Sequence, residues 1–329
     1  MVEKTKALEA YQEAGEDPKA LECIPMLKRS DIKKEAAKIV NEELTVDNSL
    51  FLYHDVCTNG IGYVDLMFKT DSIAPEQIPY LGLLKSVLGY VDTEHYTYGE
   101  LFNEINANTG GINCGVEVFD RADSTEEFQA MFSVRGKALY TKMDFLFKMI
   151  GEILNSSKLE DTKRLYEIVA SVKSRAQVNL TGAGHSTAVL RAAAYSSPMA
   201  AFQDEMAGIG YYQFIEKLEK DFEQRKEETV EELCKLMKKI LRPENFMISY
   251  TGERESLETV QKLAGTVKAG LGTEPVEKSK EKLTCTKKNE GFKTSGQVQY
   301  VAQTGNFKKK GLEYTCLLYT SPSPRDPKT

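Results

Sequence analysis

The stretch from Cys57 to Phe119 constrains the fold more than any other part of this sequence. Asn59-Gly60 is the pair most typical of a type I′ turn, because both positions of that turn need a positive φ. The runs on either side, Leu50 to Cys57 and Ile61 to Thr70, are largely apolar, so a β-hairpin is predicted there. An apolar helical segment, Glu76 to Gly89, and a glycine-rich corner, Asn108 to Gly111, follow before the next strand. This order predicts that strands and helices alternate along one domain.

The apolar periodicity changes from two to helical spacing and back along the chain. Period two runs through Ile112 to Val118 and through Phe128 to Val134, whereas helical spacing begins at Leu139. Predicted helices span residues 2–15, 76–89, 98–108, 139–154, 165–172, 224–241 and 257–264, and a further strand spans 246–250. Gly182-Ala183-Gly184 and Ser197-Pro198 are predicted helix breaks. The ordering predicts an α+β fold in which helices pack on one face of a mainly antiparallel sheet.

Composition agrees with a folded protein and excludes some partners. The 329 residues are 41% hydrophobic, enough to bury one large core or two smaller ones. Lys+Arg 43 against Asp+Glu 49 gives a net charge of -6 with both signs interspersed, so neither nucleic acid nor a membrane is an expected partner. The 6 cysteines lie far apart without a C-x-x-C motif, which favours reduced thiols in a cytoplasmic chain. No apolar run approaches membrane-spanning length, and the N-terminus lacks the apolar core of a signal peptide.

Three features in this order resemble a known family. They are the segment from Ala20 to Ile32, the Asn59-Gly60 hairpin with its following apolar helix, and Asn108 to Gly111 opening a new strand. Together they resemble the presequence-protease branch of the pitrilysin/insulinase zinc metallopeptidases. The resemblance covers about Ala20 to Thr315. The resemblance implies that this chain corresponds to the region after the helical linker that joins the two halves of those enzymes. A third, degenerate copy of the fold begins in that region.

The resemblance also implies a domain organisation. Residues 1–48 are expected to be the end of the helical inter-half linker and a connector, and 49–268 a third, non-catalytic peptidase-like domain. Residues 269–290, rich in Gly, Lys, Glu and Thr without periodicity, are a predicted linker, and 291–315 the truncated start of a fourth domain. Residues 316–329 do not resemble the continuation of the family and are interpreted as a non-native tail, with a genuine Pro-rich tail as the alternative.

The zinc chemistry of this family requires H-x-x-E-H on a helix, and the sequence contains no such motif. Its histidines are His54, His95 and His185, and the ungapped match to the motif, Gly82 to Ser86, offers neither ligand nor base. His54 and Cys57, the nearest metal-capable pair, are expected on opposite faces of a strand. No catalytic, cofactor-binding or metal-ligating residue is therefore predicted in this chain. Convergence in space of His95, His185 and a distant carboxylate stays open.

One other motif imitates a catalytic site. Gly184-His185-Ser186-Thr187-Ala188 has the spacing of a nucleophile elbow, which needs a preceding strand and a later histidine. No histidine follows His185 in the sequence. The motif is therefore interpreted as a helix start capped by Ser186.

The function implied by the resemblance is that of a non-catalytic piece. The chain would be a C-terminal-half segment of a zinc metalloendopeptidase that degrades unfolded peptides inside a closed chamber. Zinc would belong to the missing first domain, and this chain alone is expected to be inactive. Expected partners are the missing N-terminal catalytic half, the rest of the fourth domain and the peptide substrate. The alternative is a stand-alone non-catalytic subunit that accompanies a separate catalytic chain.

Overall fold

The computed structural model describes residues 2–15, 18–35, 38–121, 123–279, 281, 283–294, 297–313 and 315. The chain divides into two units, residues 1–40 and 41–329. The first unit holds the helices α1 (Val2–Glu13) and α2 (Pro18–Glu22) and the 3-10 turn η1 (Arg29–Asp31). No residue of α1 is buried, so this helix does not pack its apolar side chains into a core within the described residues. The predicted non-native tail, residues 316–329, lies outside the described residues.

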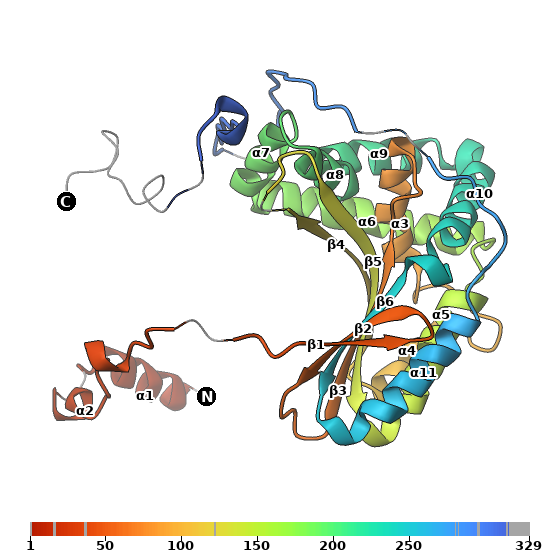
Figure 1. Cartoon of the computed structure of the whole chain (residues 1–329). Helices are drawn as coiled ribbons and strands as arrows, with labels where there is room; N and C mark the ends of the chain where they lie inside the picture. The colour runs from red at the N-terminus through yellow and green to blue at the C-terminus, as the bar shows by residue number, and fades with distance from the viewer. Residues whose placement is uncertain are drawn as a thin grey trace. The chain divides into compact units, whose positions relative to one another are not determined.

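The second unit is built on one six-stranded sheet with the order β1-β2-β6-β3-β5-β4 (Figure 1). The strands are β1 (Glu42–Val46), β2 (Ser49–Asp55), β3 (Ile61–Lys69), β4 (Ile112–Asp120), β5 (Phe128–Leu139) and β6 (Phe246–Gly252). Among these described strands only the β2–β6 pair is parallel, and every other neighbouring pair is antiparallel. The last strand in sequence inserts between β2 and β3, so these two strands are not neighbours. The β-hairpin predicted there is wrong, because β6 pairs with both strands in place of their pairing with each other. The predicted mainly antiparallel sheet is confirmed.

Two tight turns organise the start of the sheet. Asn59 and Gly60 have φ values of 55° and 81°, as the predicted type I′ turn requires. Asp47 and Asn48, with φ values of 49° and 62°, make a second turn of the same kind between β1 and β2. The strand β1 thus lies within residues 1–48, for which the sequence predicted a linker end and no strand. Asp and Asn tolerate the left-handed region better than most residues, so Asp47-Asn48 was the sequence signal for a turn between two strands.

The helices follow the sequence prediction closely. They are α3 (Ile78–Val87), α4 (Tyr98–Asn108), α5 (Met143–Ser156), α6 (Thr162–Gly182), α7 (Gly184–Ala193), α8 (Pro198–Ala207), α9 (Ile209–Lys220), α10 (Phe222–Ile240) and α11 (Leu257–Ala269). The break at Ala183 separates α6 from α7 as predicted. Ser197 caps α8 by accepting a hydrogen bond from the amide of Ala200, and Pro198 begins the helix. The helix predicted from Leu139 begins instead at Met143, because β5 extends to Leu139 and the 3-10 turn η3 (Tyr140–Lys142) follows it.

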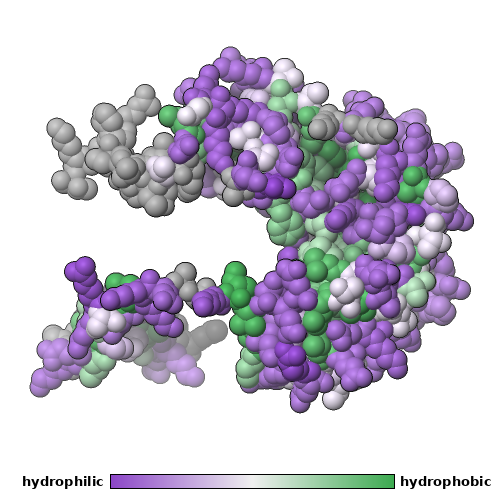
Figure 2. Space-filling view, viewed as in Figure 1, coloured by the Kyte–Doolittle hydropathy of each residue, from purple (hydrophilic) through white to green (hydrophobic). Residues whose placement is uncertain are grey.

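The core lies between one face of the sheet and the helices (Figure 1). In β6 the side chains of Phe246, Ile248 and Tyr250 are buried while their neighbours are only half-buried, so the predicted period of two is confirmed. The same core takes in residues from α3, α5, α6, α9, α10 and α11. Figure 2 shows mostly hydrophilic residues over the helical layer and more apolar residues along the sheet. Helices on one face of the sheet are therefore confirmed.

The described residues of 291–315 contain no strand and only one 3-10 turn, η6 (Lys308–Lys310). Among the described helices, none combines the length and the apolar character needed to cross a lipid bilayer.

Candidate functional site

The helix α3 occupies the place where the resemblance aligns the zinc motif. Eight of its ten residues are buried, and only Lys85 and Ser86 are half-buried. A β-carbon on Gly82 would lie 2.5 Å from the backbone oxygen of Met206 and 2.7 Å from the ring of Tyr211. The space beside the first motif position is therefore already filled by α8 and α9. Burial also lowers the pKa of Lys85, which stands at the glutamate position of the motif.

The three histidines are held on different elements by different partners. His54 on β2 contacts the hydroxyl of Ser249 through Nε2 at 3.2 Å. The Nδ1 atom of His95 lies 3.0 Å from Oε2 of Glu152 on α5. The ring of His185 lies beside that of Tyr300, with centroids 6.0 Å apart. Within the described part of the chain, no three His, Cys, Asp or Glu side chains gather as a metal site would require.

The contact between Glu152 and His95 joins two parts of the domain. Its side chain is 9% exposed, and it accepts hydrogen bonds from the amide and the ring of His95. Although burial favours the neutral acid, hydrogen bonds from Thr93 and His95 hold the pKa of Glu152 below its ordinary value. The pair thus ties the loop before α4 to α5, which is a structural role.

The nucleophile-elbow motif is not an elbow in the folded chain. Gly184 begins α7, and the element before it is the helix α6 rather than a strand. His185 and Ser186 both lie in the first turn of α7, and the residue at the N-cap is Ala183. The predicted cap by Ser186 is therefore wrong, because the helix begins earlier than the sequence suggested. A helical Ser186 also lacks the strained turn that exposes a nucleophile.

A polar cluster at one end of the sheet was not predicted. The carboxylate of Glu253, just after β6, accepts hydrogen bonds from the amides of Thr58 and Gly60 at 3.2 and 3.3 Å. The hydroxyl of Tyr140 donates to the same carboxylate at 2.5 Å and accepts from the Glu253 amide at 2.7 Å. We call these four residues the Glu253 cluster. The hydrogen bond from Tyr140, aided by the amide donors, holds the pKa of Glu253 below its ordinary value.

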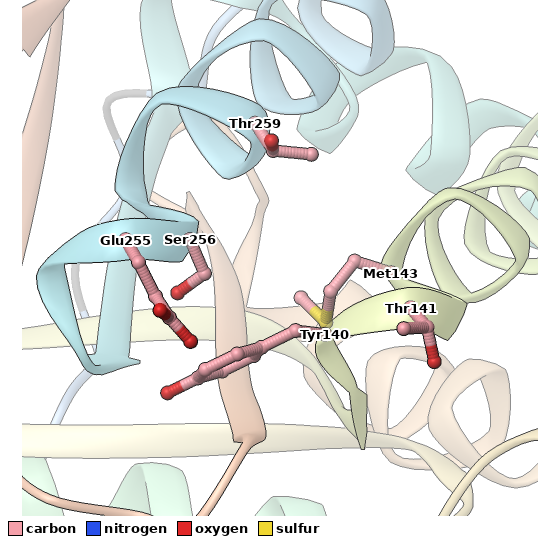
Figure 3. A pocket seen from close by; sticks show the side chains of 6 residues that line it. All are labelled: Tyr140, Thr141, Met143, Glu255, Ser256 and Thr259. Carbon is pink, nitrogen blue, oxygen red and sulfur yellow. The ribbon is translucent and has the colours of Figure 1, made fainter.

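An open pocket lies beside this cluster, and Figure 3 shows its lining. Its cavity volume is about 330 Å³, and Tyr140, Thr141, Met143, Glu255, Ser256 and Thr259 line it. The hydroxyl of Ser256 donates to the backbone oxygen of Glu253 at 2.8 Å and lies 2.5 Å from the hydroxyl of Tyr250. None of the six lining residues is a histidine or a cysteine. Within the Glu253 cluster the polar groups hydrogen-bond to one another, so the cluster joins strand ends and supplies no nucleophile paired with a base.

The comparisons with known proteins decide the family. The model of the family described as associated with peptidases of family M16, subfamily C, matches residues 1–218. The chain belongs to this peptidase-associated family. The match extends from the helical first unit into α9, and it confirms the predicted relationship to the presequence-protease branch of the pitrilysin/insulinase peptidases.

Relatives of known name agree with this assignment. Protein HypA of Clostridium perfringens is 35% identical over 315 residues, which are 96% of this chain and 32% of that protein. Presequence protease 1, chloroplastic/mitochondrial, of Arabidopsis thaliana is 28% identical over 313 residues, 94% of this chain and 29% of that protein. This peptidase-associated chain therefore spans about a third of the length of these relatives.

A solved structure supports the fold alone. The crystal structure of a protease from Helicobacter pylori superimposes with a TM-score of 0.51 at 14% identity, over 74% of this chain and 54% of that one. The peptidase-associated chain therefore shares its arrangement of sheet and helices with a known protease.

Proposed function

We propose that this chain is a non-catalytic, C-terminal-half segment of a zinc metalloendopeptidase that degrades unfolded peptides inside a closed chamber. In this proposal the segment forms part of the chamber wall. Zinc and the groups that activate its water come from the first domain of the complete enzyme. The family match over residues 1–218 is the observation that carries the proposal.

The packing around α3 supports the non-catalytic part of the proposal. A catalytic copy of the fold would need two imidazoles one helical turn apart with open space for metal, water and substrate. Here Gly82 faces the backbone of α8 and the ring of Tyr211 at distances that leave no room for a side chain. A metal site at this helix would require α8 and α9 to move away.

The sheet face opposite the helices supports a role as a wall. Arg135 on β5 pairs with Asp65 on β3 at 2.8 Å and with Glu117 on β4 at 3.1 Å. Arg135 is 54% exposed, and the neighbouring Tyr63 is 43% exposed. A face that mixes ion pairs with exposed aromatic area suits contact with water and with extended peptides better than burial in an apolar interface.

The catalytic half can reside in the same polypeptide or in a separate chain, and the segment suits either arrangement. Location in the cytoplasm is also part of this proposal. The proposed partners are the catalytic half, the remainder of the fourth domain and the peptide substrate. The first two would complete the chamber around the peptide.

A chimera tests the proposed function. The segment of Arabidopsis presequence protease 1 that aligns with this chain is replaced by residues 1–315, and zinc-dependent cleavage of an unstructured peptide is measured. We expect activity well above that of the same protease with the segment deleted. The isolated chain, assayed in parallel, should show none. Chelator-sensitive cleavage by the isolated chain would refute the assignment of a non-catalytic segment.

A further inference from the structure

The segment predicted to be a linker follows the surface of the domain. The Nη1 atom of Arg242 donates to the backbone oxygen of Glu274 at 2.5 Å, and the amide of Ser279 donates to the oxygen of Ser72 at 3.1 Å. Leu283 is half-buried and packs against the core. We call residues 283–294 the connector. Its path is set by contacts with the helical layer.

The connector makes a charged contact with α7 at Glu290. Arg191 on α7 donates through Nε to Oε2 of Glu290 at 2.8 Å and through Nη2 to Oε1 at 3.2 Å. The hydroxyl of Tyr195 also donates to Glu290. The two parallel bonds from one guanidinium to one carboxylate are the bidentate geometry that Arg forms best. Glu290 is thus bound by three donors that lie about 100 residues earlier in the chain.

Asp204 on α8 holds Arg191 in place for this contact. Its Oδ2 atom accepts from Nη1 of Arg191 at 2.6 Å, so the far edge of the guanidinium is fixed. Asp204 is 2% exposed and Arg191 14% exposed. The amides of Ile209 and Gly210 donate to Asp204 at 3.1 and 3.2 Å, which orients its carboxylate from the start of α9. Arg191 is therefore positioned by the domain whether or not Glu290 is bound.

Apart from Glu290, the described connector contacts include the packing of Leu283 against the core and the ring of Phe292, whose centroid lies 5.8 Å from the guanidinium carbon of Arg191. Beneath the connector lies a cavity of about 240 Å³, lined by Ala194, Ala201 and Asp204 on the helical side and by Leu283, Thr284 and Lys288 on the connector. A densely packed segment would fill this space. Glu290, with a side chain 26% exposed, forms a described ion pair between the connector and the helices. A segment held mainly by an ion pair, with an open cavity beneath it, loses little apolar burial when it is released.

We propose that Arg191 and Tyr195 form a carboxylate-binding clasp that holds the connector at Glu290 and releases it when that contact opens. Asp204 is a positioning residue for the clasp, since it contacts Arg191 and not Glu290. Opening would free the connector from α7 and α8 while the sheet and its core stay folded. The clasp is independent of the proposed peptidase role, because all of its contacts lie within this chain.

Limited proteolysis of the full chain tests the clasp. Trypsin cleaves after lysine, and the connector offers Lys287, Lys288 and Lys293. Cleavage at these sites reports the population of released connector when opening and closing are fast. We expect Glu290→Gln to speed cleavage about tenfold, which corresponds to about 1.4 kcal/mol. Tyr195→Phe, which removes only the hydroxyl donor, should speed it less.

The matched control is Glu277→Gln, which removes a carboxylate from the preceding segment that has no described ion pair. It should leave the cleavage rate unchanged, and far-UV circular dichroism should show the same fold for all variants. Raising the salt concentration should speed cleavage of the wild type more than of Glu290→Gln, because salt screens the ion pair. Equal rates for wild type and Glu290→Gln, or equal acceleration by Glu277→Gln, would overturn the proposal.

Discussion

Replacing Gly82 by alanine tests whether α3 is sealed against α8 and α9. The added β-carbon would lie 2.5 Å from the backbone oxygen of Met206, a distance that real β-carbons essentially never show. A second close contact, at 2.7 Å, falls on the ring of Tyr211, which is itself 5% exposed and packed in the core. The backbone oxygen cannot move by a change of rotamer. The helices must separate or the new methyl group must strain the packing.

The expected size of the effect follows from two opposing contributions. Alanine stabilises a helix interior by about 1 kcal/mol relative to glycine. Overpacking a core costs about 1–3 kcal/mol, and a clash with backbone belongs at the upper end. The free energy of unfolding of Gly82→Ala should therefore fall by about 2 kcal/mol. Gly151 on α5 is the control, because a β-carbon there meets nothing within 4 Å.

Urea denaturation followed by circular dichroism measures both variants. With a slope of about 2 kcal/mol per M, the midpoint for Gly82→Ala should fall by about 1 M at an unchanged slope. Gly151→Ala should raise the free energy of unfolding by about 0.5–1 kcal/mol. If both variants gained stability alike, α8 and α9 would not approach α3 as closely as described. The packing beside α3 would then leave space for a metal site.

Three further predictions concern charge, the C-terminus and metal. Glu253→Gln should make the loss of stability in acid less steep. The folded pKa of Glu253 lies below its ordinary value of 4.5, so the stability that its carboxylate contributes is present above pH 4.5. That stability is lost as the pH falls through the folded pKa. Thermal melts between pH 2 and 7 measure this, and identical acid limbs for variant and wild type would contradict it. Deleting residues 316–329 should leave the melting temperature unchanged, because their prolines and polar side chains offer little to bury, and a fall of several degrees would mean that they dock on the domain. Metal analysis of the dialysed protein should find zinc far below one equivalent, since His54, His95 and His185 are held by separate partners, whereas stoichiometric zinc that is lost on His95→Ala or His185→Ala would refute this.

Local sequence patterns predicted most of the secondary structure. Asn59-Gly60 identified a turn because both residues adopt the positive φ that the turn requires, and the φ values agree. The alternation in Phe246, Ile248 and Tyr250 identified a strand, because successive side chains on a strand point to opposite faces. The family resemblance also came from the order of such local features, and the match over residues 1–218 confirms it.

The tertiary structure decided everything that joins distant residues. Tyr140 and Glu253 are 113 positions apart, and Arg191 and Glu290 are 99 apart, so no short pattern could connect either pair. The insertion of β6 between β2 and β3 likewise depends on pairing across the whole domain. Gly82 reads in the sequence as an ordinary weak helix residue, and only the approach of α8 and α9 makes it necessary. Sequence periodicity records which face of an element is buried, whereas the choice of partner is made by packing.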